Sequence, residues 1–170
     1  MCKFLSAIVT RDGRVLSAPE YTDSHEDLIA AFRLRDYGLD HFCRVEYTPK
    51  GAEYDNLDSY VLRLDEDDEP SWWAERKDDV EAELRHRIEA MIVREDHDIL
   101  LGGCWIIASG TVKIAKSCTI RNMYGTSSVG SMSDTSRVGS MYGTSSVGSM
   151  SGTSSVGSMS GTSSVGFHVR

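Results

Sequence analysis

A nine-residue repeat in the C-terminal part of the chain constrains the fold more than any other feature of the sequence. The segment Val-Gly-Ser-Met-Ser-Gly-Thr-Ser-Ser occupies 147–155 and recurs at 156–164, and close copies occupy 120–128, 129–137 and 138–146. Self-similarity at a fixed short period is typical of solenoids and other repeat arrays. Nine residues are too few for a helix with its turn, but they suit one short strand followed by one turn. We therefore expect a short β-solenoid over residues 99–170, with two nine-residue units in each coil.

Two apolar positions recur along the units and predict the interior of this solenoid. Valine holds one position and methionine the other, and we place Trp105 and Ile114 at the start of the methionine series, where they would cap the first coil. The alternative is a disordered linker rich in Gly, Ser and Thr, but a linker has no need to keep Val and Met in register. The predicted core residues are Trp105, Ile114, Met123, Val129, Met132, Val138, Met141, Val147, Met150, Val156 and Met159.

Side-chain alternation along a strand assigns the remaining positions of the unit. If Val156 faces the interior, Thr153 and Ser155 face solvent. Since the valine and the methionine lie three residues apart, we expect a turn between them at Gly157 and a second turn at Gly161. The predicted outward-facing Thr/Ser ladder consists of Thr126, Ser128, Thr144, Ser146, Thr153, Ser155, Thr162 and Ser164.

Residues 1–98 predict an acidic α+β domain with one long helix. Apolar runs on either side of Gly13 predict a hairpin over 4–17, and a second hairpin is expected over 41–64. Helix-capping side chains at 22–24 precede a short amphipathic helix over 25–34. The long helix is expected over 71–94, and strands follow it at 99–101 and 105–107. The apolar stripe of this long helix consists of Trp73, Val80, Leu84, Ile88, Met91 and Ile92.

The two parts of the chain carry opposite net charges. Residues 1–101 contain 25 Asp and Glu against 13 Lys and Arg, whereas residues 102–170 contain one Asp against five Lys and Arg. An acidic domain of this kind is repelled by a nucleic-acid backbone, so we expect no direct nucleic-acid binding. The same charge permits binding to a basic protein partner.

The acidic run at 65–69 and the tryptophans that follow it predict a partner-binding surface. An exposed tryptophan beside acidic residues is a suitable anchor for a protein partner. Two simpler alternatives are that both rings pack on the sheet and that the acidic run is a solvated cap of the long helix. The run lacks the ligand spacing and the glycine of a calcium-binding loop. The candidate partner-binding residues are Trp72, Trp73, Asp65, Asp67, Asp68 and Glu69.

The remaining polar motifs predict no catalytic residue, no metal site and no cofactor. The four cysteines form no C-x-x-C pair, and no G-x-S-x-G nucleophile motif occurs. His25, Glu26 and Asp27 could form a metal or acid–base site, but a solvated first helical turn is the simpler interpretation. We see no signal peptide and no apolar run long enough to cross a membrane, and we expect a cytoplasmic protein in a bacterial cell.

Short motifs spread over the chain carry a family resemblance. They are Cys2-x-Phe4, the run from Asp23 to Leu28, the run from Arg44 to Pro49, Leu64-Asp65 and Pro70-x-Trp72. This pattern resembles uncharacterised phage and prophage proteins in which a small α/β domain and a long helix precede short repeats rich in Gly, Thr and Val. The resemblance implies a mobile-element protein that works inside a bacterium, and it transfers no catalytic residue.

Three functions fit these features. The first is a non-enzymatic interaction protein that forms homo-oligomers through the solenoid, since stacked coils present open strand edges, and that binds a host or phage protein. The second is an acidic mimic of nucleic acid that inhibits a host defence or DNA enzyme. The third is a binder of ice or glycans that uses the Thr/Ser ladder.

Overall fold

The computed structural model describes residues 5–35, 40–51 and 53–169 and divides the chain into two compact units, 1–89 and 90–170. The division falls earlier than the expected one after residue 98. The reason is that β5 (Ile92–Val93), which comes directly after the long helix, pairs in parallel with β7 (Cys104–Ile107) and is already a solenoid strand.

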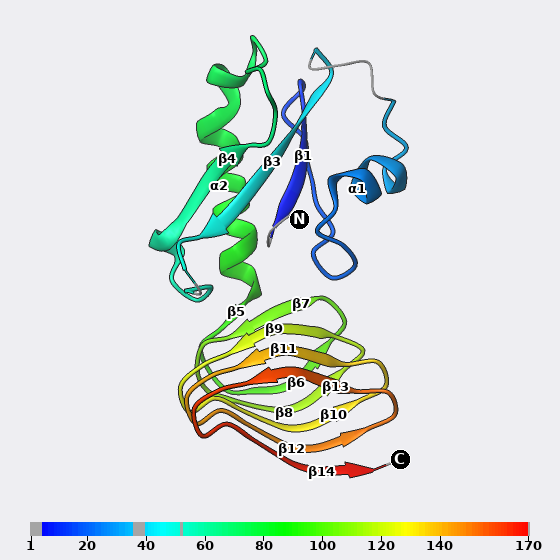
Figure 1. The fold of residues 1–170 in the computed structure, drawn as a ribbon, viewed down its shortest axis with the longest axis vertical. Helices are drawn as coiled ribbons and strands as arrows, with labels where there is room; N and C mark the ends of the chain where they lie inside the picture. The colour runs from blue at the N-terminus through cyan, green and yellow to red at the C-terminus, as the bar shows by residue number, and fades with distance from the viewer. Residues whose placement is uncertain (1–4, 36–39, 52, 170) are drawn as a thin grey trace. The chain divides into compact units, whose positions relative to one another are not determined.

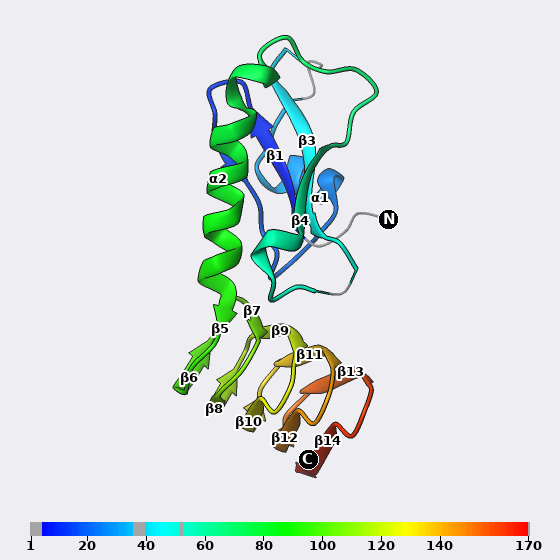
Figure 2. The same cartoon turned by 90° about the vertical axis from the view of Figure 1, so that its left-hand side faces the viewer.

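The first unit contains a four-stranded antiparallel sheet in the order β2-β1-β3-β4. Figures 1 and 2 show helix α2 along one face of this sheet and helix α1 on the other side. Both predicted hairpins are present, and the second one contains a short 3-10 helix at Leu57–Ser59. The elements are β1 (Ser6–Thr10), β2 (Val15–Leu16), α1 (His25–Ala31), β3 (Phe42–Pro49), β4 (Tyr60–Leu64) and α2 (Trp73–Met91).

Local signals explain both helices. The Ser24 side chain caps α1 by accepting a hydrogen bond from the Asp27 backbone N–H. Leu28 of α1 packs on Ile8 and Phe42 of the sheet and forms a small buried cluster with them. Helix α2 buries four of the six predicted stripe positions, Trp73, Val80, Leu84 and Ile88. Met91 is only partly buried, and the helix ends there, three residues before the predicted end, because Ile92 already belongs to a strand.

The second unit is a β-solenoid of about four turns. Its strands form two five-stranded parallel sheets, in the orders β14-β12-β10-β8-β6 and β13-β11-β9-β7-β5. Val129 pairs with Val147 across β10 and β12, and Val138 pairs with Val156 across β11 and β13. The further strands are β6 (His97–Leu101), β8 (Thr111–Lys116), β9 (Thr119–Met123), β10 (Ser128–Ser133), β11 (Arg137–Met141), β12 (Ser146–Ser151), β13 (Ser155–Met159) and β14 (Ser164–Val169).

The predicted interior is largely correct, but the predicted turn between valine and methionine is wrong. Val129 and Met132 belong to one continuous strand and both are buried. Because residues three apart on a flat strand face opposite sides, β10 must bend between them. Gly130 lies in this bent stretch, and a Cβ atom there would come within 2.7 Å of the Lys113 carbonyl oxygen, so glycine is needed for close backbone contact. Glycine at 157 holds the equivalent place, and no turn forms there.

The turns occur instead at the other glycine of the unit, where φ is positive. Gly125, Gly143, Gly152 and Gly161 all have a left-handed backbone, as predicted for Gly161. Asp134 holds the equivalent place in another unit, with φ of 58°. Asp is one of the few residues that tolerate this conformation, so the repeat accepts it without losing the turn.

Four of the predicted core positions need correction. Ile114 is 42% exposed, because the first coils are shorter than the later ones and Ala115, not Ile114, pairs with Met132. Trp105 pairs with Ile120 of the valine series and is partly buried, next to a register shift in β7. Met159 is 45% exposed in an edge strand, and Val156 is partly buried. The buried members are Met123, Val129, Met132, Val138, Met141, Val147 and Met150.

The predicted Thr/Ser ladder is not one flat face. The threonines Thr126, Thr144, Thr153 and Thr162 are exposed, but they lie in the turns and not on the strands. Ser155 and Ser164 are exposed, whereas Ser128 and Ser146 are partly buried at the starts of their strands. Successive units contribute to different sheets, so Thr153 does not stack above the other three.

Candidate functional site

The predicted tryptophan anchor is absent from the surface. Trp72 and Trp73 are only 7% and 3% exposed, and their rings meet edge to face with centroids 6.4 Å apart. The simpler alternative from the sequence, that both rings are packed inside, is correct. Their burial follows from the position of α2, which begins at Trp73 and lies along the sheet. Neither ring can serve as an exposed partner contact.

The acidic run at 65–69 is divided between structural and exposed carboxylates. Asp65 lies 3.1 Å from Nδ1 of His25. The Glu66 carboxylate accepts hydrogen bonds from the Arg44 backbone N–H at 2.8 Å and from the Arg44 guanidinium at 3.1 Å. The other three acids, Asp67, Asp68 and Glu69, are exposed. Asp65 is also exposed, at 54%, but its carboxylate already contacts His25, so the other three acids are the more available ones for a basic partner.

His25 is buried, so the prediction of a fully solvated helical turn is wrong at this residue. Its side chain is 1% exposed, and Nε2 lies 3.0 Å from the Val45 carbonyl oxygen. A carbonyl oxygen can only accept, so Nε2 carries the proton of this hydrogen bond. With Asp65 on the other ring nitrogen, His25 connects α1 to β3 and to the segment after β4. This arrangement is structural.

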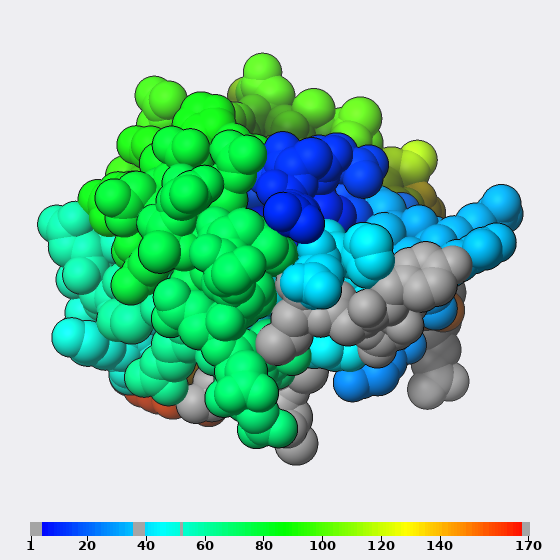
Figure 3. Space-filling model, turned by 90° about the horizontal axis from the view of Figure 1, so that it is seen from above, coloured from blue at the N-terminus to red at the C-terminus, as the bar shows by residue number. Residues whose placement is uncertain are grey.

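A cavity lined by arginines lies between the β1–β2 turn, the end of α1 and the start of β3. Its volume is about 620 Å³. Figure 3 shows the neighbouring surface, where the β1–β2 turn in dark blue adjoins the start of β3 in cyan. The Arg11 backbone N–H donates to the His41 carbonyl oxygen at 2.9 Å and holds these two segments together. The lining residues include Arg11, Arg14, Arg33, Arg35, His41 and the apolar Leu34 and Phe42.

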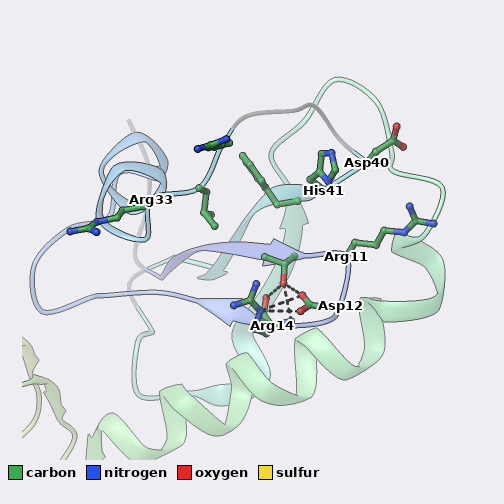
Figure 4. A pocket seen from close by; sticks show the side chains of 10 residues that line it. Arg11, Asp12, Arg14, Arg33, Asp40 and His41 are labelled. Atoms are coloured by element: carbon green, nitrogen blue, oxygen red, sulfur yellow. Dashed lines mark hydrogen bonds and ion pairs between the residues drawn. The ribbon is translucent and has the colours of Figure 1, made fainter.

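A closed set of hydrogen bonds fixes one wall of this cavity. Within the turn, Thr10 donates through its hydroxyl to the Asp12 carboxylate, and Arg14 Nε donates to the same carboxylate at 3.1 Å (Figure 4). The hydrogen bond from Thr10 and then the Arg14 guanidinium lower the pKa of Asp12. Asp12 therefore stays ionised and orients Arg14.

The arginines of the cavity come from both of its sides. Figure 4 shows Arg33 beside α1 on one side, Arg11 on the opposite side, and His41 between them; the ends of the Arg33 and Arg11 side chains point outward. Arg33 has a left-handed backbone with φ of 55°, and the N–H of Leu34 donates to the Ile29 carbonyl oxygen at 2.9 Å. This is a Schellman-type helix end, in which glycine is the usual residue at the place of Arg33.

The sequence interpretation missed this cavity. Arg11 and Arg14 flank a glycine turn, and Arg33 and Arg35 end a helix, so the two pairs are separated by a whole element. The available signal was that four basic residues of an acidic domain lie at its first turn and just after its short helix. Their meeting depends on the pairing of β1 with β3, which the sequence alone does not specify.

The last coil of the solenoid presents a second candidate surface. β13 and β14 stand at the edges of their sheets, each hydrogen-bonded to one neighbour only within the described residues. Two large apolar side chains are exposed in these strands, Met159 at 45% and Phe167 at 78%. An apolar side chain beside an open strand edge favours pairing with another chain.

Among the described residues, no cluster of three or more His, Cys, Asp and Glu could hold a metal ion. Burial, followed by the nearby Glu66 charge, raises the pKa of the Cys43 thiol to about 12, so this cysteine is a poor nucleophile at neutral pH. In the described part of the chain, none of the helices combines the length and apolar character that a membrane span requires.

Comparisons with known proteins leave the family open. The chain matches no protein-family model, and the comparisons with curated proteins and with solved structures gave no match. The resemblance to phage and prophage proteins therefore stays a prediction.

Proposed function

We propose that this protein is a non-enzymatic interaction protein that forms homo-oligomers through its C-terminal β-solenoid. The observation that carries the proposal is the last coil, where two open strand edges coincide with the exposed side chains of Met159 and Phe167. We also infer two nine-residue units in each full coil, which the pairing of Val129 with Val147 supports.

The occupant of this edge that fits best is a second copy of the same chain. A strand edge carries both N–H donors and C=O acceptors, so it can pair with an identical edge related by a two-fold axis. Such pairing would also bury Met159 and Phe167 against their equivalents. Apolar burial and new backbone hydrogen bonds then act together, which is the basis of edge-to-edge association.

Sedimentation of the 170-residue chain tests the proposal. We expect a concentration-dependent oligomer, and we expect the double variant Met159→Lys with Phe167→Lys to be monomeric, because lysines on an edge oppose pairing. Leu101→Lys is the matched control, since Leu101 is also exposed, at 62%, but lies in β6 at the far end of its sheet. A monomeric parent chain, or loss of the oligomer in the control alone, would overturn the proposal.

We further propose that the protein works inside a bacterial cell on behalf of a phage or other mobile element, where it binds a host or phage protein. Affinity capture from infected bacteria is the direct test. Recovery of the same partner in independent captures, and its loss when the last coil is altered, are the expected results. Capture of no reproducible partner would count against this part of the proposal.

The acidic alternative keeps support from the exposed carboxylates of Asp67, Asp68 and Glu69. A sharp test neutralises these three residues to Asn and Gln but leaves Asp65 and Glu66, which hold His25 and Arg44. Inhibition of a DNA-handling enzyme that disappears in this variant would favour the acidic mimic. The ice- or glycan-binding alternative has less support, because its threonines lie in turns and form no flat surface.

A further inference from the structure

We propose that the arginine-lined cavity of the first unit binds a small organic phosphate of about nucleotide size. This inference is independent of the proposed oligomer, because it concerns residues of the β1–β2 turn, the end of α1 and the start of β3. Its basis is the gathering of Arg11, Arg14, Arg33 and Arg35 around one cavity.

The charge around the cavity is opposite to that of the unit that contains it. Residues 1–89 carry 22 Asp and Glu against 12 Lys and Arg, yet four of those 12 basic residues line this single cavity. Two acids also line it, Asp12 and Asp40, which leaves a positive excess. Asp12 is already bound by Thr10 and Arg14, so its charge is partly compensated inside the turn. The cavity is therefore a local anion-attracting site.

The acidic surroundings select for a compact anion. A long polyanion such as DNA would extend beyond the cavity and meet the acidic surface of the unit, where its phosphates are repelled. A ligand with one to three phosphates fits within the cavity, and the exposed side chains of Arg11, Arg33 and Arg35 can turn toward it. The planar fork of a guanidinium matches two phosphate oxygens at once, which is why arginine is preferred for phosphate recognition.

The size and the apolar part of the lining indicate an organic ligand. A volume of about 620 Å³ lies within the range of small-molecule sites and exceeds what a lone phosphate ion needs. Leu34 is partly buried and Phe42 is 3% exposed, and both line the cavity next to the arginines. A lining that combines apolar and cationic side chains suits an organic group joined to a phosphate.

The backbone of Arg33 supports a role for its side chain. The left-handed conformation at this helix end is the one for which glycine is the usual residue. An arginine there has an unfavourable backbone without any packing gain from burial, since Arg33 is exposed. Unfavourable conformations of this kind are concentrated at binding sites.

The test measures binding of ADP to the full chain by calorimetry, with adenosine, inorganic phosphate and a single-stranded oligonucleotide as further probes. We expect ADP to bind, adenosine to bind far more weakly, and phosphate and the oligonucleotide to bind more weakly than ADP. The double variant Arg33→Gln with Arg35→Gln should lose roughly tenfold or more in affinity, because each charge-assisted hydrogen bond contributes strongly.

Arg63→Gln is the matched control, because Arg63 is an exposed arginine on β4 of the same unit that does not line the cavity. It should bind ADP like the parent chain, and circular dichroism should show that all variants are folded. Four results would overturn the proposal: no ADP binding at millimolar concentration, equal binding of inorganic phosphate, tighter binding of the oligonucleotide, or the same loss in the Arg63 control. Arg11→Gln, on the opposite side of the cavity, gives an independent second variant that should also weaken ADP binding.

Discussion

The two units bury apolar side chains by different rules. In the first unit the buried side chains are large and each has its own surroundings, as Leu5, Tyr47 and Leu84 show. In the solenoid the same two residue types, valine and methionine, recur in register and pair with copies of themselves in the next coil. A substitution in the first unit therefore changes one unique set of contacts, whereas a substitution in the solenoid tests a position that recurs.

This difference also shows in the backbone. The first unit relies on antiparallel pairing between strands of unlike sequence, such as β1 with β3. The solenoid brings backbones so close that the glycines of the bend leave no room for a Cβ atom, as at Gly148, whose Cβ would lie 2.6 Å from the Gly130 carbonyl oxygen. Side-chain volume limits the first unit, and backbone contact limits the second.

The largest effect is expected in the core of the first unit. Ile8 is fully buried between Leu28 and Phe42. Ile8→Ala should lower the free energy of unfolding by about 2–5 kcal/mol, because it removes buried apolar volume that the surroundings cannot refill. Urea unfolding followed by tryptophan fluorescence measures the change. The exposed Ile99→Ala is a matched control with an expected change near zero, and a similar loss in the control would mean that burial does not decide the effect.

A smaller but more specific effect is expected at the bend of the solenoid. Gly148→Ala should cost about 1–3 kcal/mol, because even one methyl group collides with the preceding coil. Gly125→Asp is the control: it adds a larger side chain, but nothing lies within 4 Å and Asp tolerates the left-handed turn. We expect its cost to be below about 1 kcal/mol. Urea unfolding followed by circular dichroism compares the two variants. A larger loss of stability in Gly125→Asp would contradict the claim that close backbone contact limits the size of the residue at the bend.

Sequence periodicity predicted the solenoid well where the repeat is regular. From Met123 to Met150 the valine and methionine positions are buried as expected, because the same residue type recurs at the same position in neighbouring units. The prediction failed at Ile114, where the first coils are shorter, and no periodic signal marks that change. It failed again at Gly157, since the sequence does not show whether a glycine serves a turn or a close contact.

In the first unit, local signals located the elements but not their contacts. Ser24 and Pro70 marked the helix starts, and Gly13 marked a hairpin. The burial of Trp72 depends on how helix α2 meets the sheet, and the arginine cavity depends on strand order. These are tertiary relations between distant segments, which residue patterns along the chain do not contain.

Arg33 tests whether a residue of the first unit lowers stability in order to bind a ligand. Arg33→Gly should raise the free energy of unfolding by up to about 1 kcal/mol, since it removes the side chain from a left-handed position. Affinity for ADP should fall in the same variant. Urea unfolding and calorimetry measure both quantities, and Arg35→Gly, at a residue without a positive φ, is the control that should not gain stability. If Arg33→Gly gained both affinity and stability, the Arg33 side chain would have no role in ADP binding.

The smallest effect concerns two buried serine hydroxyls in the solenoid, those of Ser136 and Ser145. Ser136 Oγ donates to the Ser133 carbonyl oxygen at 2.7 Å, whereas Ser145 Oγ is buried without a hydrogen-bond partner in the described part of the chain. Ser136→Ala should therefore cost about 1 kcal/mol, because it removes a buried hydrogen bond. Ser145→Ala should be neutral or slightly stabilising, because an unpaired hydroxyl is costly to bury. Both serines are fully buried, so the difference between the two variants in urea unfolding reports the hydrogen bond and not a difference in burial. Equal losses in the two variants would show that the Ser136 hydrogen bond adds nothing to stability.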